Sequence, residues 1–172
     1  GISMLDSPSD ILPPALKYLG KDPHSKSEAD YAEVEKMLTA VRPFVKYFHS
    51  SQYINDLAGG ELCAVIGWSG DVFIAQARAE EAGSQAEISY SIPKEGTLLW
   101  VDSLAIPKDA KNVDNALKFI DYLNRPQVAA NGVNYVSYAS PNTAALELVD
   151  PSSATPKKAR FRKCSSTIRN DF

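Results

Sequence analysis

The 172-residue chain has 44% hydrophobic and 23% charged residues, an ordinary composition for a globular protein that buries one good core or two small ones. This balance excludes disordered and fibrous classes. No apolar run approaches the length of a membrane span, so we expect no direct membrane insertion.

Charge is distributed unevenly along the chain. Residues 155–172 contain six of the 18 basic residues and one of the 21 acidic ones, which leaves 12 basic and 20 acidic residues in 1–154. An acidic body favours cationic ligands and argues against nucleic acid as a partner. We interpret the basic tail as a solvated or frayed end.

Cysteine and histidine usage indicates neither a disulfide framework nor a metal centre. The two cysteines, Cys63 and Cys164, are too few for such a framework, and Cys63 lies in an apolar run, where a buried free thiol is the simplest interpretation. His24 and His49 form no familiar metal-ligand spacing with them. We expect no metal and no cofactor.

The first part of the chain alternates helical and strand patterns. After an apolar start, a helix capped by Ser7 or Ser9 is expected to reach Leu19 and to end at Gly20, beginning late enough for Pro13 and Pro14 to fall in its first turn. The later expected elements are a helix over 31–41, a strand over 45–48, a short helix over 52–57 capped by Ser50 or Ser51, and a helix over 72–82.

The second part is expected to contain further strands and helices. Residues 87–92 alternate, 98–106 form a strand-like run, 113–123 form a clear helix, 127–131 form a turn and 133–138 form a strand. Strands that alternate with helices predict an α/β layered domain.

One stretch, residues 61–71, places a large ring and a carboxylate together. Residues 62–67 are continuously apolar, which is typical of a strand buried on both faces, and Trp68 and Asp71 follow at its carboxyl end. Open α/β sheets bind ligands at that end of their strands. The alternative for Asp71 is a structural one, because a carboxylate at a helix start caps free amides and complements the helix dipole.

Residues 98–106 repeat the pattern with Trp100 and Asp102. Alternation places both side chains on one face of the expected strand, and a carboxylate in an apolar run needs a partner. That partner is either a group inside the protein or a ligand ammonium. Core packing is the default role of Trp68 and Trp100, although a tryptophan face also holds a cation or the methylenes of an amine.

No catalytic constellation competes with this interpretation. The sequence has no nucleophile elbow and no phosphate-cradling glycine loop. Paired carboxylates could perform acid–base chemistry, but tryptophans beside both favour binding. We therefore expect that the chain is not an enzyme.

Three segments carry a resemblance to a known family: FHSSQYINDLAGGELCAVIGWSGDV, YSIPKEGTLLWVDSLAIPKDAKN and ALKFIDYLNRPQVAA. From about Gly1 to Ala144 the chain resembles the periplasmic putrescine- and spermidine-binding proteins of ABC importers. The resemblance implies an α/β type II periplasmic-binding-protein fold, in which two lobes close around a polyamine that is passed to a permease. It also implies a periplasmic location and no enzymatic activity.

The resemblance assigns ligand contacts to residues already singled out. It implies that Trp68 and Asp71, Trp100 and Asp102, and Tyr138 after the RP-containing helix contact the ligand. Where putrescine-binding relatives carry a glutamate, this chain has Ser9, so another small cationic solute is an alternative ligand.

The resemblance also predicts how the chain is divided. The chain is expected to be the second half of such a protein, with residues 1–90 as the main part of the second lobe, 91–141 as a returning segment of the first lobe, and 142–172 as a return to the second lobe followed by a divergent basic tail. In relatives a cysteine preceding the equivalent of Gly1 can pair with the one matching Cys63. A non-binding truncated fragment and a lobe-swapped oligomer remain alternatives.

Overall fold

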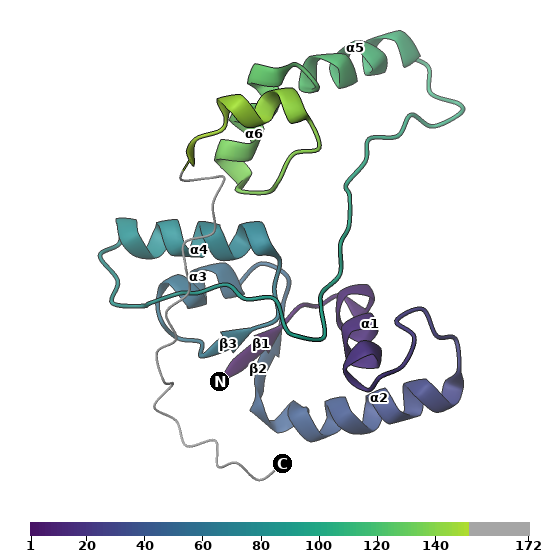
Figure 1. Cartoon of the computed structure of the whole chain (residues 1–172), viewed down its shortest axis with the longest axis vertical. Coiled ribbons are helices and arrows are strands. Elements are labelled where there is room, and N and C mark those ends of the chain that lie inside the picture. The colour runs from purple at the N-terminus through teal and green to yellow at the C-terminus, as the bar shows by residue number, and fades with distance from the viewer. Residues whose placement is uncertain (152–172) are drawn as a thin grey trace.

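The computed structural model describes residues 1–151, and the basic tail with Cys164 lies outside them. The described chain forms a small sheet with helices packed around it, followed by a helical segment reached through a long extended stretch (Figure 1). Its elements are β1 (Ile2–Met4), α1 (Pro8–Tyr18), α2 (Glu28–Val41), η1 (Arg42–Phe44), β2 (Val45–Phe48), α3 (Tyr53–Ala58), β3 (Ala64–Val65), α4 (Ser69–Glu81), α5 (Val113–Leu123), α6 (Pro126–Val136) and η2 (Thr143–Leu148).

The sheet is parallel, with strand order β2-β1-β3. Parallel neighbours require crossover connections, which α1 with α2 and α3 provide. The main core cluster lies on this sheet and contains Met4, Leu5, Ile11, Val45, Tyr53 and Leu62. The predicted α/β class is therefore confirmed.

Helix α1 begins at Pro8, directly after Ser7 at the N-cap position, and Gly20 follows its end with a φ of 72°. The expectation of a late start is wrong, because Pro13 and Pro14 lie inside the helix. Each proline removes one amide donor from the helix, and the buried face formed by Ile11, Ala15 and Leu16 compensates through packing.

Histidine, not serine, supports the start of α3. The ring Nδ1 of His49 accepts hydrogen bonds from the Ser51 and Gln52 amides at 3.1 and 3.0 Å. The Ser50 hydroxyl instead accepts from the Asp6 amide at 3.2 Å. The expected serine cap is therefore wrong, because Gln52 is the N-cap residue and the first amides of the helix donate to the Ser51 and Gln52 carbonyls.

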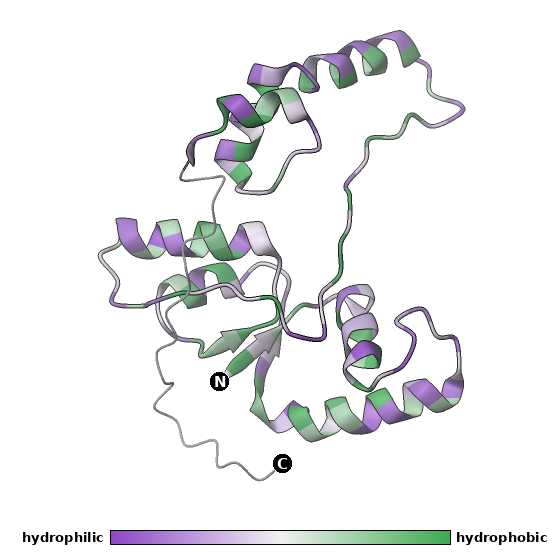
Figure 2. Cartoon of the chain, in the orientation of Figure 1, coloured by the Kyte–Doolittle hydropathy of each residue, from purple (hydrophilic) through white to green (hydrophobic). Residues whose placement is uncertain are grey.

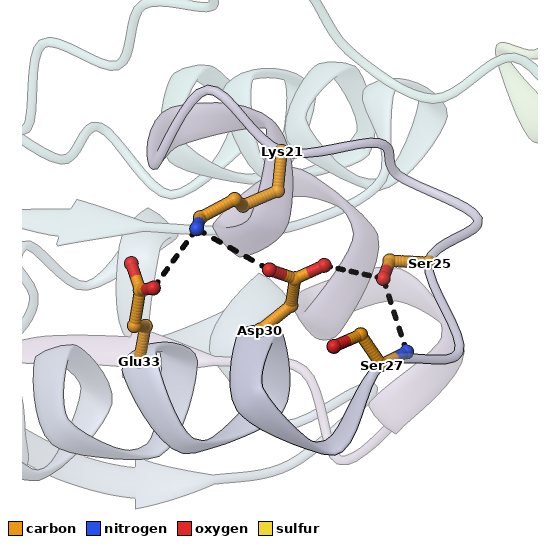
Figure 3. Close-up of polar contacts among 5 residues, drawn as sticks. All are labelled: Lys21, Ser25, Ser27, Asp30 and Glu33. Carbon is orange, nitrogen blue, oxygen red and sulfur yellow. Dashed lines mark hydrogen bonds and ion pairs between the residues drawn. The ribbon is translucent and has the colours of Figure 1, made fainter.

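A polar network fixes the loop between α1 and α2 to the first turn of α2 (Figure 3). Lys21 Nζ lies 3.2 Å from Asp30 Oδ1 and 2.8 Å from Glu33 Oε1. The Ser25 hydroxyl donates to Asp30 Oδ2 at 2.5 Å and accepts from the Ser27 amide at 3.1 Å. Acidic residues in this turn also complement the amino end of the helix dipole.

Two predictions about residues 62–67 are wrong. The strand there is only Ala64–Val65, and it pairs with β1 alone at the edge of the described sheet, so Ala64 is exposed instead of buried on both faces. Cys63 is exposed and disulfide-bonded, not a buried free thiol.

Residues 126–136 form one helix, α6, in place of the expected turn and strand. The helix buries Ala130 and Val133 against Ala145 and Val149. It ends at Ser137, which has a left-handed φ of 59°. A short apolar run fits a strand and a buried helix equally, and here the contacts with η2 select the helix.

The expected strand over 98–106 is also wrong. The segment crosses an open region toward α5 without joining the sheet, and hydrophobic residues recur along it (Figure 2). Leu99 is 94% exposed and Val101 71% exposed. No described strand lies beside the segment to satisfy its amide and carbonyl groups, so its sequence pattern alone does not produce a strand. Residues 87–92 likewise form no strand.

Within residues 1–151 no helix is long and apolar enough to cross a membrane. The same residues contain no group of three or more histidine, cysteine or acidic side chains that could hold a metal ion.

Candidate functional site

The candidate site is built around the amino end of α4. Trp68 occupies the N-cap position with extended backbone, and Asp71 is the third residue of the helix. A carboxylate at that position often reaches back to the N-cap amide, and in any case it is favoured by the helix dipole. Here Asp71 makes no side-chain cap and turns toward two tyrosines.

Tyr53 of α3 lies between the N-cap amide and the carboxylate. Its hydroxyl accepts a hydrogen bond from the Trp68 amide at 3.1 Å and donates to Asp71 Oδ2 at 2.6 Å. The side chain of Tyr53 is fully buried in the core cluster on the sheet. The Tyr53 hydroxyl therefore links the Trp68 amide to the Asp71 carboxylate. In a capping box the carboxylate would accept directly from that amide.

Tyr138 reaches the same carboxylate from the other end of the described chain. It follows the left-handed Ser137 at the end of α6, and its hydroxyl donates to Asp71 Oδ1 at 2.9 Å. This bond joins residues 67 positions apart and fastens the end of α6 to the start of α4. Each carboxylate oxygen of Asp71 thus accepts one phenol.

The glycines on either side of Trp68 make room for the two rings. A Cβ at Gly67 would lie 2.8 Å from Cε2 of Tyr53, and one at Gly70 would overlap the ring of Tyr138. Neither glycine has a positive φ, so both are required for space and not for backbone conformation. The two glycines of the motif G-W-S-G-D therefore each accommodate one tyrosine ring, Gly67 that of Tyr53 and Gly70 that of Tyr138.

Burial and the shared carboxylate keep both phenols neutral. The pKa of Tyr53 lies well above its usual value, first because the side chain is buried and second because its hydroxyl donates to Asp71. The pKa of Tyr138 is raised by the same two causes in the same order. The charge of Asp102 raises the pKa of Tyr138 slightly further, so Asp102 lies within electrostatic reach of Tyr138.

The six residues predicted from the sequence differ in where the structure places them. Tyr138 contacts Asp71 directly, the Trp68 amide is linked to Asp71 through the Tyr53 hydroxyl, and Asp102 acts on Tyr138 through its charge. Trp100 is 43% exposed on the extended segment. Ser9 is exposed near the start of α1, and its hydroxyl lies 3.1 Å from that of Ser7. Within the described residues no hydrogen bond joins Trp100 or Ser9 to Asp71.

Sequence reasoning missed Tyr53. The available signal was weak, because the short helix predicted over 52–57 contains an aromatic residue whose hydroxyl needs a partner once it is buried. The sequence does not identify that partner, since Asp71 lies 18 residues away on another helix.

A separate hollow of about 450 Å³ between α1 and α2 is lined mainly by apolar side chains, including Leu12, Leu38 and Phe48. It contains none of the predicted site residues. The carboxylate at α4 is therefore the better candidate for a charged ligand.

The arrangement at α4 can bind a cation that carries N–H groups. An ionised carboxylate offers about four acceptor positions, and the two phenols occupy one on each oxygen, which leaves acceptors for further donors. The half-buried Trp68 packs partly against the core cluster on the sheet and precedes Asp71 by three residues, and an indole face attracts a cation or an alkyl chain.

Residues 1–160 match the family described as bacterial extracellular solute-binding protein. The chain belongs to this family. It is 49% identical over 150 residues to the putrescine-binding periplasmic protein PotF of Escherichia coli, and 46% identical over 149 residues to the putrescine-binding periplasmic protein SpuD of Pseudomonas aeruginosa. Each match covers 87% of this chain but only 40% and 41% of the relative, so the chain spans about two fifths of the length of these curated proteins.

The fold is that of type II periplasmic binding proteins. The crystal structure of the TpPotD lipoprotein of Treponema pallidum superposes with a TM-score of 0.73 at 28% identity, covering 84% of this chain and 46% of that one. The similarity to putrescine-binding periplasmic proteins expected from the sequence is thereby confirmed, and the matched family is one of solute-binding proteins.

Proposed function

We propose that this chain contributes to the capture of a linear polyamine, such as putrescine or spermidine, in the periplasm for delivery to the permease of an ABC importer. The observation that carries the proposal is the Asp71 carboxylate, held by two phenols beside Trp68 at the start of α4. The names of the similar proteins, which bind putrescine, support the same ligand class.

In this proposal each side chain has a chemical role. Asp71 and Asp102 pair with ammonium groups, while Trp68, Trp100 and Tyr138 surround the methylene chain. Ser9 contributes to ligand choice. The role is binding and involves no catalysis, and neither a metal nor a cofactor takes part.

We also propose a division of the chain into lobes. Residues 1–90 would form the main part of the second lobe, 91–141 a returning segment of the first, and 142–172 a return to the second. The sheet and α1 to α4 all fall within 1–90, and α5 and α6 fall within 91–141, which supports this division.

Calorimetric titration of the 172-residue chain with putrescine tests the assignment. Asp102→Asn removes an exposed carboxylate and is expected to weaken binding about tenfold or more, the scale of a hydrogen bond to a charged group. Asp109→Asn, an exposed residue with the same change of charge, is the matched control and is expected to leave binding unchanged. Equal affinities for the two variants would refute the role of Asp102.

Asp71→Asn tests the centre of the site. Asparagine keeps the side-chain size but loses the charge, so binding is expected to fall at least as far as with Asp102→Asn. Asp56→Asn is its control, because Asp56 also accepts a tyrosine hydroxyl, at 2.5 Å from Tyr47, and among the described residues it forms no hydrogen bond with Trp68 or Asp71. Competition among putrescine, spermidine and arginine then identifies the preferred solute.

A further inference from the structure

Tyr53 makes contacts that its place in the core does not require. A buried phenol needs only one partner, yet the Tyr53 hydroxyl joins two parts of the candidate site, the Trp68 amide at 3.1 Å and Asp71 Oδ2 at 2.6 Å. The ring is fully buried and lies so close to Gly67 that a Cβ there would be 2.8 Å from its Cε2. The hydroxyl therefore has a fixed position to which the site is attached.

We propose that Tyr53 is a positioning residue, whose hydroxyl holds the Asp71 carboxylate and the Trp68 main chain in their ligand-receiving orientation before any ligand binds. The identity of the ligand in this statement rests on the proposed function. Tyr53 itself does not touch the ligand, because its side chain is fully buried.

The position of Asp71 in α4 explains why it needs such support. A carboxylate in the first turn of a helix can rotate toward solvent or back to the N-cap amide. Tyr53 accepts from the N-cap amide itself, so the carboxylate cannot rotate back to that amide. Tyr53 also donates to Oδ2, which opposes rotation of the carboxylate toward solvent. Tyr138 donates to Oδ1, so both oxygens are held and the remaining acceptor positions have fixed directions.

Preorganisation of this kind increases affinity by reducing the ordering that binding would otherwise require. Loss of the Tyr53 hydroxyl should therefore affect affinity separately from stability. A comparison is available in Tyr47, whose hydroxyl donates to Asp56 at 2.5 Å and whose ring packs against the same core cluster. That pair joins β2 to α3, and among the described residues neither of its side chains forms a hydrogen bond with Trp68 or Asp71.

The test compares Tyr53→Phe with Tyr47→Phe in the full chain. Two quantities are measured: hydrogen exchange of the Trp68 amide without ligand, and putrescine affinity by calorimetry. Tyr53→Phe is expected to accelerate exchange at Trp68 and to weaken putrescine binding about tenfold. Tyr47→Phe is expected to lower thermal stability to a similar degree while leaving both quantities unchanged. Unchanged exchange at Trp68 in Tyr53→Phe would overturn the proposal, as would equal affinity losses in the two variants.

The two measurements separate this proposal from the proposed function. If the unmodified chain binds no amine, polyamine capture by this chain is refuted, and exchange at Trp68 still decides whether Tyr53 holds the site. If Tyr53→Phe does not fold, Gly67→Ala replaces it, because the added Cβ would lie 2.8 Å from the Tyr53 ring and displace the hydroxyl. Faster exchange at Trp68 in Gly67→Ala supports the proposal, and unchanged exchange overturns it.

Discussion

Gly67 and Gly70 determine how the site around Trp68 is assembled. Each faces a tyrosine ring, and each ring carries its hydroxyl to one oxygen of Asp71. The two glycines therefore act by leaving space for the tyrosine rings. Any larger side chain competes directly with a ring of the site.

A pair of glycine substitutions tests this interpretation. Gly70→Ala would place a Cβ inside the Tyr138 ring, so we expect a loss of about 1–3 kcal/mol in the free energy of unfolding, the usual range for overpacking. Gly132→Ala in α6 meets nothing within 4 Å and should stabilise by about 0.5–1 kcal/mol through helix propensity. Urea unfolding of both variants measures the difference. Stabilisation by both would show that Tyr138 does not occupy the space above Gly70.

The phenols also predict how stability depends on alkaline pH. Because the pKa values of Tyr53 and Tyr138 in the folded chain lie above the usual 10.0, their contribution to stability is complete below pH 10.0 and is lost as pH rises toward the folded values. The free energy of unfolding should therefore fall above pH 10.0 in the unmodified chain. Tyr53→Phe should show a shallower fall, as measured by chemical unfolding at a series of pH values. A fall as steep as that of the unmodified chain would contradict the raised pKa of Tyr53.

At the scale of elements, periodicity predicted the helices well and the strands poorly. The helices now seen as α1, α2 and α5 were each expected from apolar residues at helical spacing, because a helix satisfies its own backbone groups. A strand depends on a neighbour, so residues 98–106 kept their alternating pattern and still formed none. For the same reason the site was predicted only in part. Trp68 and Asp71 are close in sequence, whereas the contact of Asp71 with Tyr53 exists only after α3 packs on α4.

The polar network between α1 and α2 predicts how the stability of the folded chain changes at acidic pH. The pKa of Asp30 is lowered, first by the Ser25 hydroxyl and then by Lys21, so its contribution to stability is present above pH 3.8 and is lost as pH falls below that value. Asp30→Asn should lower the urea midpoint at neutral pH, and the difference from the unmodified chain should shrink in acid. Glu35→Gln, an exposed substitution on the same helix with the same charge change, should show no such trend. A difference for Asp30→Asn that is independent of pH would contradict this account.

At the scale of the whole molecule, the site depends on segments far apart in the sequence. α3 supplies Tyr53, α4 supplies Trp68 and Asp71, and the end of α6 supplies Tyr138. The extended segment that connects α4 to α5 carries Asp102, whose charge reaches Tyr138. The chain covers about two fifths of its polyamine-binding relatives, and this part contains the acidic centre described here.

The most direct test of this account is a thermal melt of the 172-residue chain with putrescine, compared with 1,4-butanediol, which has the same carbon chain but no charge. A ligand at ten times its dissociation constant adds about 1.4 kcal/mol to the stability of the folded state. For a chain of this size that corresponds to a rise in midpoint of about 3–5 °C. We predict a rise with putrescine and none with the diol. A midpoint that does not move with putrescine, or that moves equally with both compounds, would contradict the assignment of Asp71 as the centre of a polyamine site.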